Sequence, residues 1–301
     1  MREDQPSSTA TLIAAATVFL DGDSRLRGLV PAGAAAWCRK YIASSPASTR
    51  VAVSALCHPA LRWLARLAER ATVPGLMLHF MLRKRLIESA VMEAISHGAS
   101  QVVVLGAGFD TLALRLHRVQ PSVTFIEIDH PATQRHKRAT IELDKAGGRN
   151  LIFQPADLTR QTLDEALSNV AVYRRSANSA FVIEGVLMYL THMEVTALFR
   201  LFGAHGGSGS RAVFTVMEPE PGGRIDFHNA TPLVKGLLRL WREPFMSGMA
   251  AAELPLFLHK FGFVLSSVAS ADNLRARYLA GFGDNPPLTA RGELVCIADK
   301  R

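Results

Sequence analysis

Gln101-Val-Val-Val-Leu-Gly-Ala-Gly-Phe-Asp-Thr111 is the stretch that decides the fold. Its first five residues are mostly apolar and β-branched, which predicts a strand covered by helices on both faces. Gly106 and Gly108 follow at the end of this strand, where glycine lets a ligand approach the backbone closely. The stretch therefore predicts the first strand and the ligand-binding turn of an α/β sheet.

Short β-branched runs alternate with helical patterns after this stretch. Capping boxes begin two of the expected helices, at Thr162-Leu-Asp-Glu165 and Thr191-His-Met-Glu194. Because strands that alternate with helices pair in parallel through right-handed crossovers, the pattern predicts a mostly parallel sheet. Its further strands are expected at 123–128, 151–154, 180–183 and 211–216, with two last strands at 263–267 and 293–298 joined by a turn containing Asn285-Pro-Pro287.

The residues before this stretch read as helices, and the composition changes near residue 98. We therefore expect an α/β, Rossmann-like, doubly wound and mostly parallel sheet with an N-terminal helical cap. The cap spans 1–98 and forms part of the acceptor site, and the core spans 99–301 with a helical insertion near 225–258. The helices are expected at 8–20, 32–43, 50–71 and 75–97 in the cap, and at 229–242 and 250–260 in the insertion.

Composition limits the class of protein. The 301 residues are 49% hydrophobic and 20% charged, so a sizeable core is possible and global disorder is excluded. Lys and Arg number 34 against 26 Asp and Glu, a modest excess that suits an anionic substrate. The basic clusters Arg135-His-Lys-Arg138 and Arg174-Arg175 are short and are interpreted as solvated faces, so no nucleic-acid partner is expected.

Three cysteines without C-x-x-C spacing exclude a disulfide framework and an all-cysteine zinc site, and favour a cytoplasmic protein. The ten histidines show no H-x-x-x-H spacing, so no metal site is expected. The apolar stretch Ala10–Leu20 is too short to span a membrane and is interpreted as a buried helix rather than a signal peptide. No membrane partner is therefore expected.

A carboxylate follows the second expected strand. Asp129 lies 21 residues after Gly108, where it can accept hydrogen bonds from ribose hydroxyls; the alternative is a glycine helix cap beside a surface aspartate. A dinucleotide-binding site requires a third small residue at the position that Thr111 occupies. The Asp110 carboxylate would also compete with a pyrophosphate at the helix N-terminus. The residues therefore favour S-adenosylmethionine, which has no phosphate, over a nicotinamide dinucleotide.

Three motifs together resemble the leucine carboxyl methyltransferase family, which consists of class I S-adenosylmethionine-dependent methyltransferases and includes bacterial O-methyltransferases of polyketide and secondary metabolism. They are Gln101–Thr111, Phe125-Ile-Glu-Ile-Asp-His-Pro131 and Ile183-Glu-Gly-Val-Leu-Met-Tyr-Leu190. The resemblance implies a cofactor site in which Arg83 meets the cofactor carboxylate, Gly106, Ala107 and Gly108 form the turn at the methionine portion, Asp129 holds the ribose, Asp157 and Leu158 contact the adenine, and Glu184 faces the methionine end.

Several of these residues also have a simpler interpretation. Arg83 and Arg85 could form a solvated basic helix face. Glu184 lies in an apolar run, where burial without a partner is costly, so it needs a bound cation or an ion pair. Tyr189 could pack in the core or line the acceptor pocket, since aromatic side chains serve both uses.

The expected function is O-methyl transfer to a carboxylate of a small or secondary-metabolite acid, such as a polyketide or acyl acid, by in-line displacement without a dedicated general base. An acceptor with an apolar body, or equally ordinary core packing, accounts for the apolar residues of the insertion, which are Phe227, Leu237, Leu238, Trp241 and Phe245. The alternatives are a hydroxyl or phenol acceptor, a non-catalytic cofactor-binding module, a nicotinamide-dependent oxidoreductase and an RNA methyltransferase. The candidates for a general base, by residue type only, are His79, His228 and His259.

Overall fold

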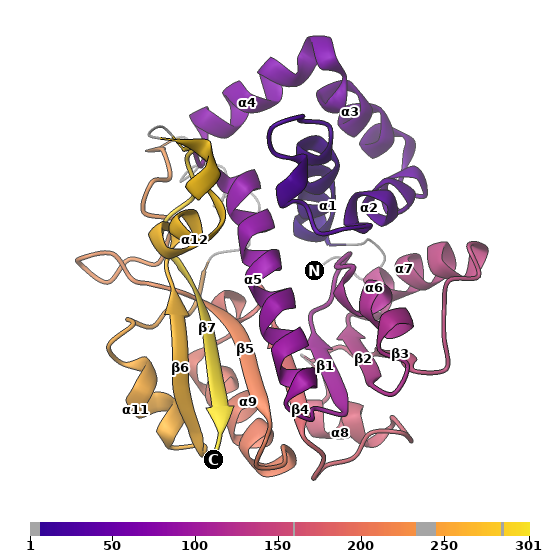
Figure 1. The fold of residues 1–301 in the computed structure, drawn as a ribbon, viewed down its shortest axis with the longest axis vertical. Helices are drawn as coiled ribbons and strands as arrows, with labels where there is room; N and C mark the ends of the chain where they lie inside the picture. The colour runs from indigo at the N-terminus through magenta and orange to yellow at the C-terminus, as the bar shows by residue number, and fades with distance from the viewer. Residues whose placement is uncertain (1–6, 159, 233–244, 284–285) are drawn as a thin grey trace.

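The computed structural model describes residues 7–158, 160–232, 245–283 and 286–301. In these residues one seven-stranded sheet has the order β3-β2-β1-β4-β5-β7-β6 (Figure 1). The first five strands pair in parallel, and β7 runs antiparallel to both β5 and β6. The predicted Rossmann-like, mostly parallel sheet is thereby confirmed. The strands are β1 (Gln101–Leu105), β2 (Thr124–Asp129), β3 (Leu151–Pro155), β4 (Ser179–Ile183), β5 (Arg211–Met217), β6 (Phe263–Ala269) and β7 (Glu293–Lys300).

Helices follow the strands as the alternation predicts. Both predicted capping boxes form: the Thr162 and Thr191 hydroxyls each accept the N–H of the glutamate three residues on, and that glutamate accepts the threonine N–H. The helices of the core are α6 (Leu112–Val119), α7 (Pro131–Leu143), α8 (Leu163–Ser168), α9 (His192–His205), α11 (Leu254–His259) and α12 (Ala271–Tyr278), with a short 3₁₀ turn at Leu187–Tyr189.

Helices cover both faces of the sheet, and β1 is buried along its whole length. Val102 and Val104 belong to an apolar core shared with α5 (Leu76–Ser96), α6 and α1 (Ser8–Asp21). Val103 and Leu105 belong to a second core shared with α8, α9 and α11. Alternate residues of one strand therefore serve two cores, as the apolar run of β1 predicts.

The N-terminal segment is helical, as expected, with one correction. The helix predicted over 50–71 is wrong as a single element, because α3 ends at Cys57 and a 3₁₀ turn over Pro59–Leu61 separates it from α4. Proline cannot donate a backbone hydrogen bond and forces the preceding residue into an extended conformation, which His58 adopts at ψ 132°. The helices are α1, α2 (Ala34–Ala43), α3 (Ala47–Cys57), α4 (Arg62–Ala71) and α5, of which α5 packs on the sheet (Figure 1).

The insertion and the last connection differ from the expectation. Most of the helix expected over 229–242 lies outside the described residues, together with Leu237, Leu238 and Trp241. The helix expected over 250–260 is shorter and spans only Leu254–His259. Between β6 and β7 the chain forms α12 rather than a turn alone, and Asn285 of the expected turn lies outside the described residues.

Within the described ranges, no helix is both long and apolar enough to cross a membrane.

Candidate active site

The turn after β1 and the end of β2 meet at the carboxyl edge of the sheet. Gly106 and Gly108 adopt positive φ angles of +61° and +48°, which L side chains rarely allow. The Gly106 and Ala107 N–H groups donate to the Ile128 carbonyl, and the Gly108 N–H donates to the Asp129 carboxylate. Asp129 also accepts the His130 N–H at 2.6 Å. The structure therefore joins the glycine turn to Asp129, which is not a detached surface residue.

A second reason explains why Gly106 cannot carry a side chain. A Cβ at this position would stand 2.4 Å from Cγ2 of Val186, which follows β4. The turn after β1 and the segment after β4 are therefore packed against each other with no room for a methyl group.

Gly106→Ala is expected to lower cofactor affinity about tenfold or more, because both the positive φ and the Val186 contact force the turn to move. Calorimetric titration with S-adenosylhomocysteine measures the change. Gly98→Ala is the matched control: its φ is +97°, but no atom lies within 4 Å of the added Cβ. It should destabilise the fold slightly and leave affinity unchanged; equal losses in the two variants would contradict the close-packing argument.

Asp110 occupies the N-terminus of α6. Its Oδ1 accepts the Thr111 N–H at 2.6 Å and lies 3.0 Å from Nζ of Lys84. Burial alone would raise the pKa of Asp110, but Lys84 outweighs it and lowers the pKa to about 2. An ionised carboxylate therefore takes the positive end of this helix, which leaves no place there for a pyrophosphate.

Arg83 is buried in the site, not on a solvated face. Only 2% of the residue is exposed. Its Nε and Nη2 donate to Oε1 of Glu184 at 2.9 and 2.7 Å, and its Nη1 donates to both carboxylate oxygens of Glu293 at 2.8 Å. The basic-face alternative is therefore excluded for Arg83, and the ion pair expected for Glu184 is present.

These pairs fix the charge of their members. Burial disfavours a charged Arg83, but Glu293 and Glu184 outweigh burial and raise its pKa. Burial likewise disfavours a charged Glu293, but Arg83 and His79 outweigh it and lower the pKa of Glu293 to about 2. At neutral pH both groups are therefore ionised.

Lys84 connects this network to Asp110, since its Nζ lies 3.1 Å from Glu184 as well. The sequence argument missed Lys84 and Glu293. Glu293 carried the same signal as Glu184, because it adjoins the apolar run Leu294–Ala298 and would be costly to bury alone. That signal indicates that each acid needs a partner. The fold shows that Arg83 donates hydrogen bonds to both of them.

Asp157 and Leu158 follow β3, beside Asp129. The Ala156 N–H donates to the Asp129 carbonyl at 2.8 Å, which holds the two strand ends together. The Asp157 carboxylate lies 4.0 Å from Nε2 of His130, and Leu158 is 37% exposed. Both residues therefore stand at the same edge of the sheet as the glycine turn, as the sequence predicts.

Tyr189 packs in an apolar group that we call the acceptor-side cluster. The tyrosine ring lies 5.8 Å from that of Phe245, between centroids. Tyr189 therefore packs in this cluster, at the ends of β4 and β5, and its role in lining an acceptor pocket stays a prediction. Its buried members are Val73, Met188, Met217, Phe227 and Ala290, with Leu76, Tyr189, Ile225, Ala230 and Phe245 packed around them.

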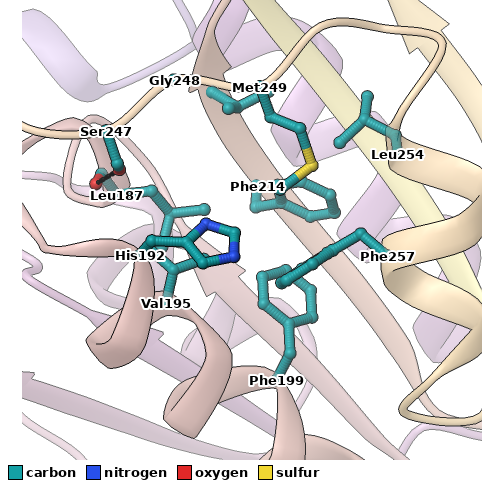
Figure 2. A pocket seen from close by; sticks show the side chains of 11 residues that line it. Leu187, His192, Val195, Phe199, Phe214, Ser247, Gly248, Met249, Leu254 and Phe257 are labelled. Atoms are coloured by element: carbon teal, nitrogen blue, oxygen red, sulfur yellow. Dashed lines mark hydrogen bonds between the residues drawn. The ribbon is translucent and has the colours of Figure 1, made fainter.

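A separate cavity lies in the second core, between β5, α9 and α11 (Figure 2). Its volume is about 10 Å³, room for one water molecule at most. It is too small for an acceptor, so we interpret it as a packing gap. Its lining includes Leu187, Val195, Phe199, Phe214, Met249 and Phe257.

The chemistry of the site fits S-adenosylmethionine. Three carboxylates, of Asp110, Glu184 and Glu293, pair with two basic side chains, those of Arg83 and Lys84, and the Asp129 carboxylate lies at the adjoining glycine turn. That excess of acids suits a ligand with a sulfonium and an ammonium, and the buried guanidinium suits its carboxylate. Within the described ranges no group of three or more His, Cys, Asp or Glu side chains is arranged to hold a metal ion.

Comparison with known proteins points the same way. The family model for leucine carboxyl methyltransferase matches residues 32–203. A Bacillus subtilis (strain 168) protein named "Putative S-adenosyl-L-methionine-dependent methyltransferase YktD" is 25% identical over 231 residues, which cover 75% of this chain and 71% of that protein. A Mycobacteroides abscessus protein with the same description is 31% identical over 149 residues, 49% of this chain and 46% of that one, so this chain matches only about half of that relative's length.

Among solved structures, magnesium protoporphyrin IX methyltransferase (ChlM) from Synechocystis, with bound SAH, has a TM-score of 0.48 at 11% identity, covering 80% of this chain and 95% of that one. An O-methyltransferase family protein from Burkholderia thailandensis has a TM-score of 0.47 at 15% identity, covering 84% and 62%.

Proposed function

Since the chain belongs to the leucine carboxyl methyltransferase family and uses S-adenosylmethionine as methyl donor, we propose that it methylates an oxygen atom of a small acceptor with an apolar body. The observation that carries this proposal is the junction of the charged network with the acceptor-side cluster. Phe227 of that cluster packs edge-on against His79, at 6.3 Å between ring centroids, and His79 bonds to Glu293 of the network. Charged and apolar surroundings thus meet around one helix end.

We propose cofactor-binding roles for the residues that meet at this edge of the sheet. We assign the cofactor's carboxylate to Arg83, its ribose to Asp129 and its ammonium to Glu184. Among the described residues, all three nitrogens of Arg83 donate to Glu184 or Glu293, and Nη2 makes one such bond with its two hydrogens, so we assign its second hydrogen to the cofactor carboxylate. The remaining roles, turn and adenine contacts, fall to Gly106, Ala107, Gly108, Asp157 and Leu158.

The protein's contribution to the reaction is alignment and exclusion of water. The bound cofactor supplies a methyl group on a sulfonium, which is already activated for in-line displacement. Arg83 and Asp129 sit on rigid elements, α5 and β2, and hold their geometry through buried hydrogen bonds. Met188 and Met217 cover the ends of β4 and β5 with apolar surface. Positioning of this kind accounts for much of the acceleration in transfer reactions.

Two acceptor classes fit an O-methyltransferase. A carboxylate is ionised at neutral pH and needs no general base, and the family description favours it. A phenol or alcohol needs a base for its proton. We further propose a small-molecule acceptor from secondary metabolism and a cytoplasmic location, which suits the reduced thiols of the buried Cys38 and Cys296.

Incubation with methyl-labelled cofactor and a panel of apolar acids and phenols tests the proposal. We expect label in an O-methyl product: an ester loses it in mild alkali, whereas an ether keeps it. Label confined to nitrogen, sulfur or carbon would refute oxygen as the acceptor. Tight cofactor binding without any product would instead support the non-catalytic alternative.

A further inference from the structure

His79 is a buried histidine held by one buried acid. It lies on α5 one turn before Arg83, so both side chains leave the same face of the helix. The side chain is 0% exposed, and its Nε2 lies 2.8 Å from Oε2 of Glu293, which is also 0% exposed. A contact this short between two side chains 214 residues apart fixes the orientation of the imidazole ring.

The state of Glu293 decides which nitrogen of His79 carries the hydrogen. Glu293 accepts two hydrogen bonds from Arg83 and is ionised at neutral pH, as its lowered pKa shows. An ionised carboxylate only accepts hydrogen bonds, so Nε2 of His79 must be the donor. In the neutral imidazole, Nδ1 then carries a lone pair and no hydrogen.

That lone pair has no partner. Nδ1 of His79 is buried and makes no hydrogen bond to any described residue. The Phe227 ring packs edge-on against the imidazole, at 6.3 Å between ring centroids, and offers no hydrogen-bond donor. An unpaired buried acceptor destabilises the fold, so its presence beside the acceptor-side cluster points to a ligand that brings an O–H group.

We propose that His79 is the general base of this enzyme, that Glu293 is its positioning residue, and that the acceptor is a phenol or alcohol hydroxyl. The proposal rests on the proposed O-methyl transfer and names its substrate class. The acceptor hydroxyl gives its proton to Nδ1 while its oxygen forms the bond to the methyl carbon. The bond between the methyl carbon and the sulfur breaks, and its electron pair stays on the sulfur. The imidazolium later releases the proton to water.

The charged surroundings of His79 suit this role. Glu293 on β7 faces Nε2 and stabilises the imidazolium that forms, while Arg83 on α5 reaches the ring only through Glu293. On the side of the imidazole that packs against Phe227, the nearby acid is Asp226. Its Oδ1 accepts the Phe227 N–H at 2.8 Å. A carboxylate acceptor would bring no proton for Nδ1, so it leaves this nitrogen unexplained.

His79→Gln tests the base, because the glutamine amide N–H can replace Nε2 as donor to Glu293 while the proton acceptor is lost. We expect kcat with a phenol to fall about 100-fold, with KM for the cofactor and the melting temperature nearly unchanged. His117→Asn is the control, since His117 is buried on α6 and its side chain bonds to the backbone of its own helix, at the Ala113 carbonyl; it should leave kcat as it is.

A measurement without turnover tests the tautomer. In protein labelled with ¹⁵N-histidine, the His79 signals at neutral pH should show a protonated Nε2 and an unprotonated Nδ1, and Glu293→Gln should change them. A protonated Nδ1, or full phenol methylation by His79→Gln, would overturn the proposal. Ester products made equally by both proteins would overturn it too and leave O-methyl transfer standing, whereas methylation only at nitrogen, sulfur or carbon would overturn both.

Discussion

Replacing Arg83 with methionine is expected to lower the free energy of unfolding by about 3–5 kcal/mol, the usual result when one partner of a buried ion pair is removed. Methionine keeps an apolar stem of similar shape but leaves the carboxylates of Glu184 and Glu293 without the guanidinium. Those side chains are only 9% and 0% exposed, so water cannot replace it. Urea unfolding at pH 7 measures the change.

The same variant should alter acid stability. The pKa of Glu293 is about 2 in the folded protein, against an ordinary value of 4.5. The ionised group therefore adds stability above about pH 4.5, and this stability is lost as the pH falls toward 2. Without Arg83 the folded-state pKa rises, so the contribution at neutral pH shrinks and the acid dependence between pH 5 and 2 becomes shallower.

Arg85→Met is the control for Arg83→Met. Arg85 lies two residues on, donates to the Gly28 carbonyl at 2.6 Å and stacks over Tyr278. Removing it should cost about 1 kcal/mol, since no buried acid loses its partner. Equal losses for the two variants would contradict the role of the buried network.

Asp129→Ala is expected to weaken S-adenosylmethionine binding by about 100-fold or more. The carboxylate accepts the N–H groups of Gly108 and His130, and each charge-assisted bond is worth about 1.5–3 kcal/mol. Its loss frees the glycine turn and removes the group that we assign to the ribose. Calorimetric titration with the cofactor and with S-adenosylhomocysteine measures the affinity.

A cofactor analogue separates the two roles of Asp129. S-adenosylhomocysteine without its ribose hydroxyls should bind the natural protein more weakly than the intact compound, but should bind Asp129→Ala equally well. Asp144→Ala, which removes a partly exposed ion pair with Lys40 at the end of α7, should leave both affinities unchanged. A hydroxyl effect that persists in Asp129→Ala would assign the ribose to another residue.

Local patterns were sufficient to predict the sheet. The run 101–105 specifies a strand buried on both faces, and the capping boxes at Thr162 and Thr191 specify where two helices begin. Each of these signals is contained in a few neighbouring residues, so no tertiary knowledge is needed. The break at Pro59 was also readable, because proline disfavours helix at the residue before it; the expected helix over 50–71 ignored that rule.

The site was only partly predictable. The spacing between the glycine turn and Asp129 predicts both, and in the structure one hydrogen bond joins them. The partners of Arg83 could not be predicted from spacing, since Glu184 and Glu293 are 101 and 210 residues away in the sequence. They meet Arg83 because α5 packs on β4 and β7. The state of His79 is further removed still, because it depends on the charge of Glu293, which depends on Arg83.

One feature of the fold bears on how such a chain can be divided. The helix α5 precedes the sheet in sequence, yet its apolar residues share one interior with β1, β4, β5 and β7, and its polar residues hold Glu184 and Glu293. Ala14 of α1 and Tyr41 of α2 belong to the same interior, so an exchange of the helices upstream of Gly75 would divide it. A crossover at residue 98 would in addition separate the sheet from α5, its own covering helix. The helices before the sheet and the sheet itself therefore form one unit of inheritance rather than two exchangeable parts.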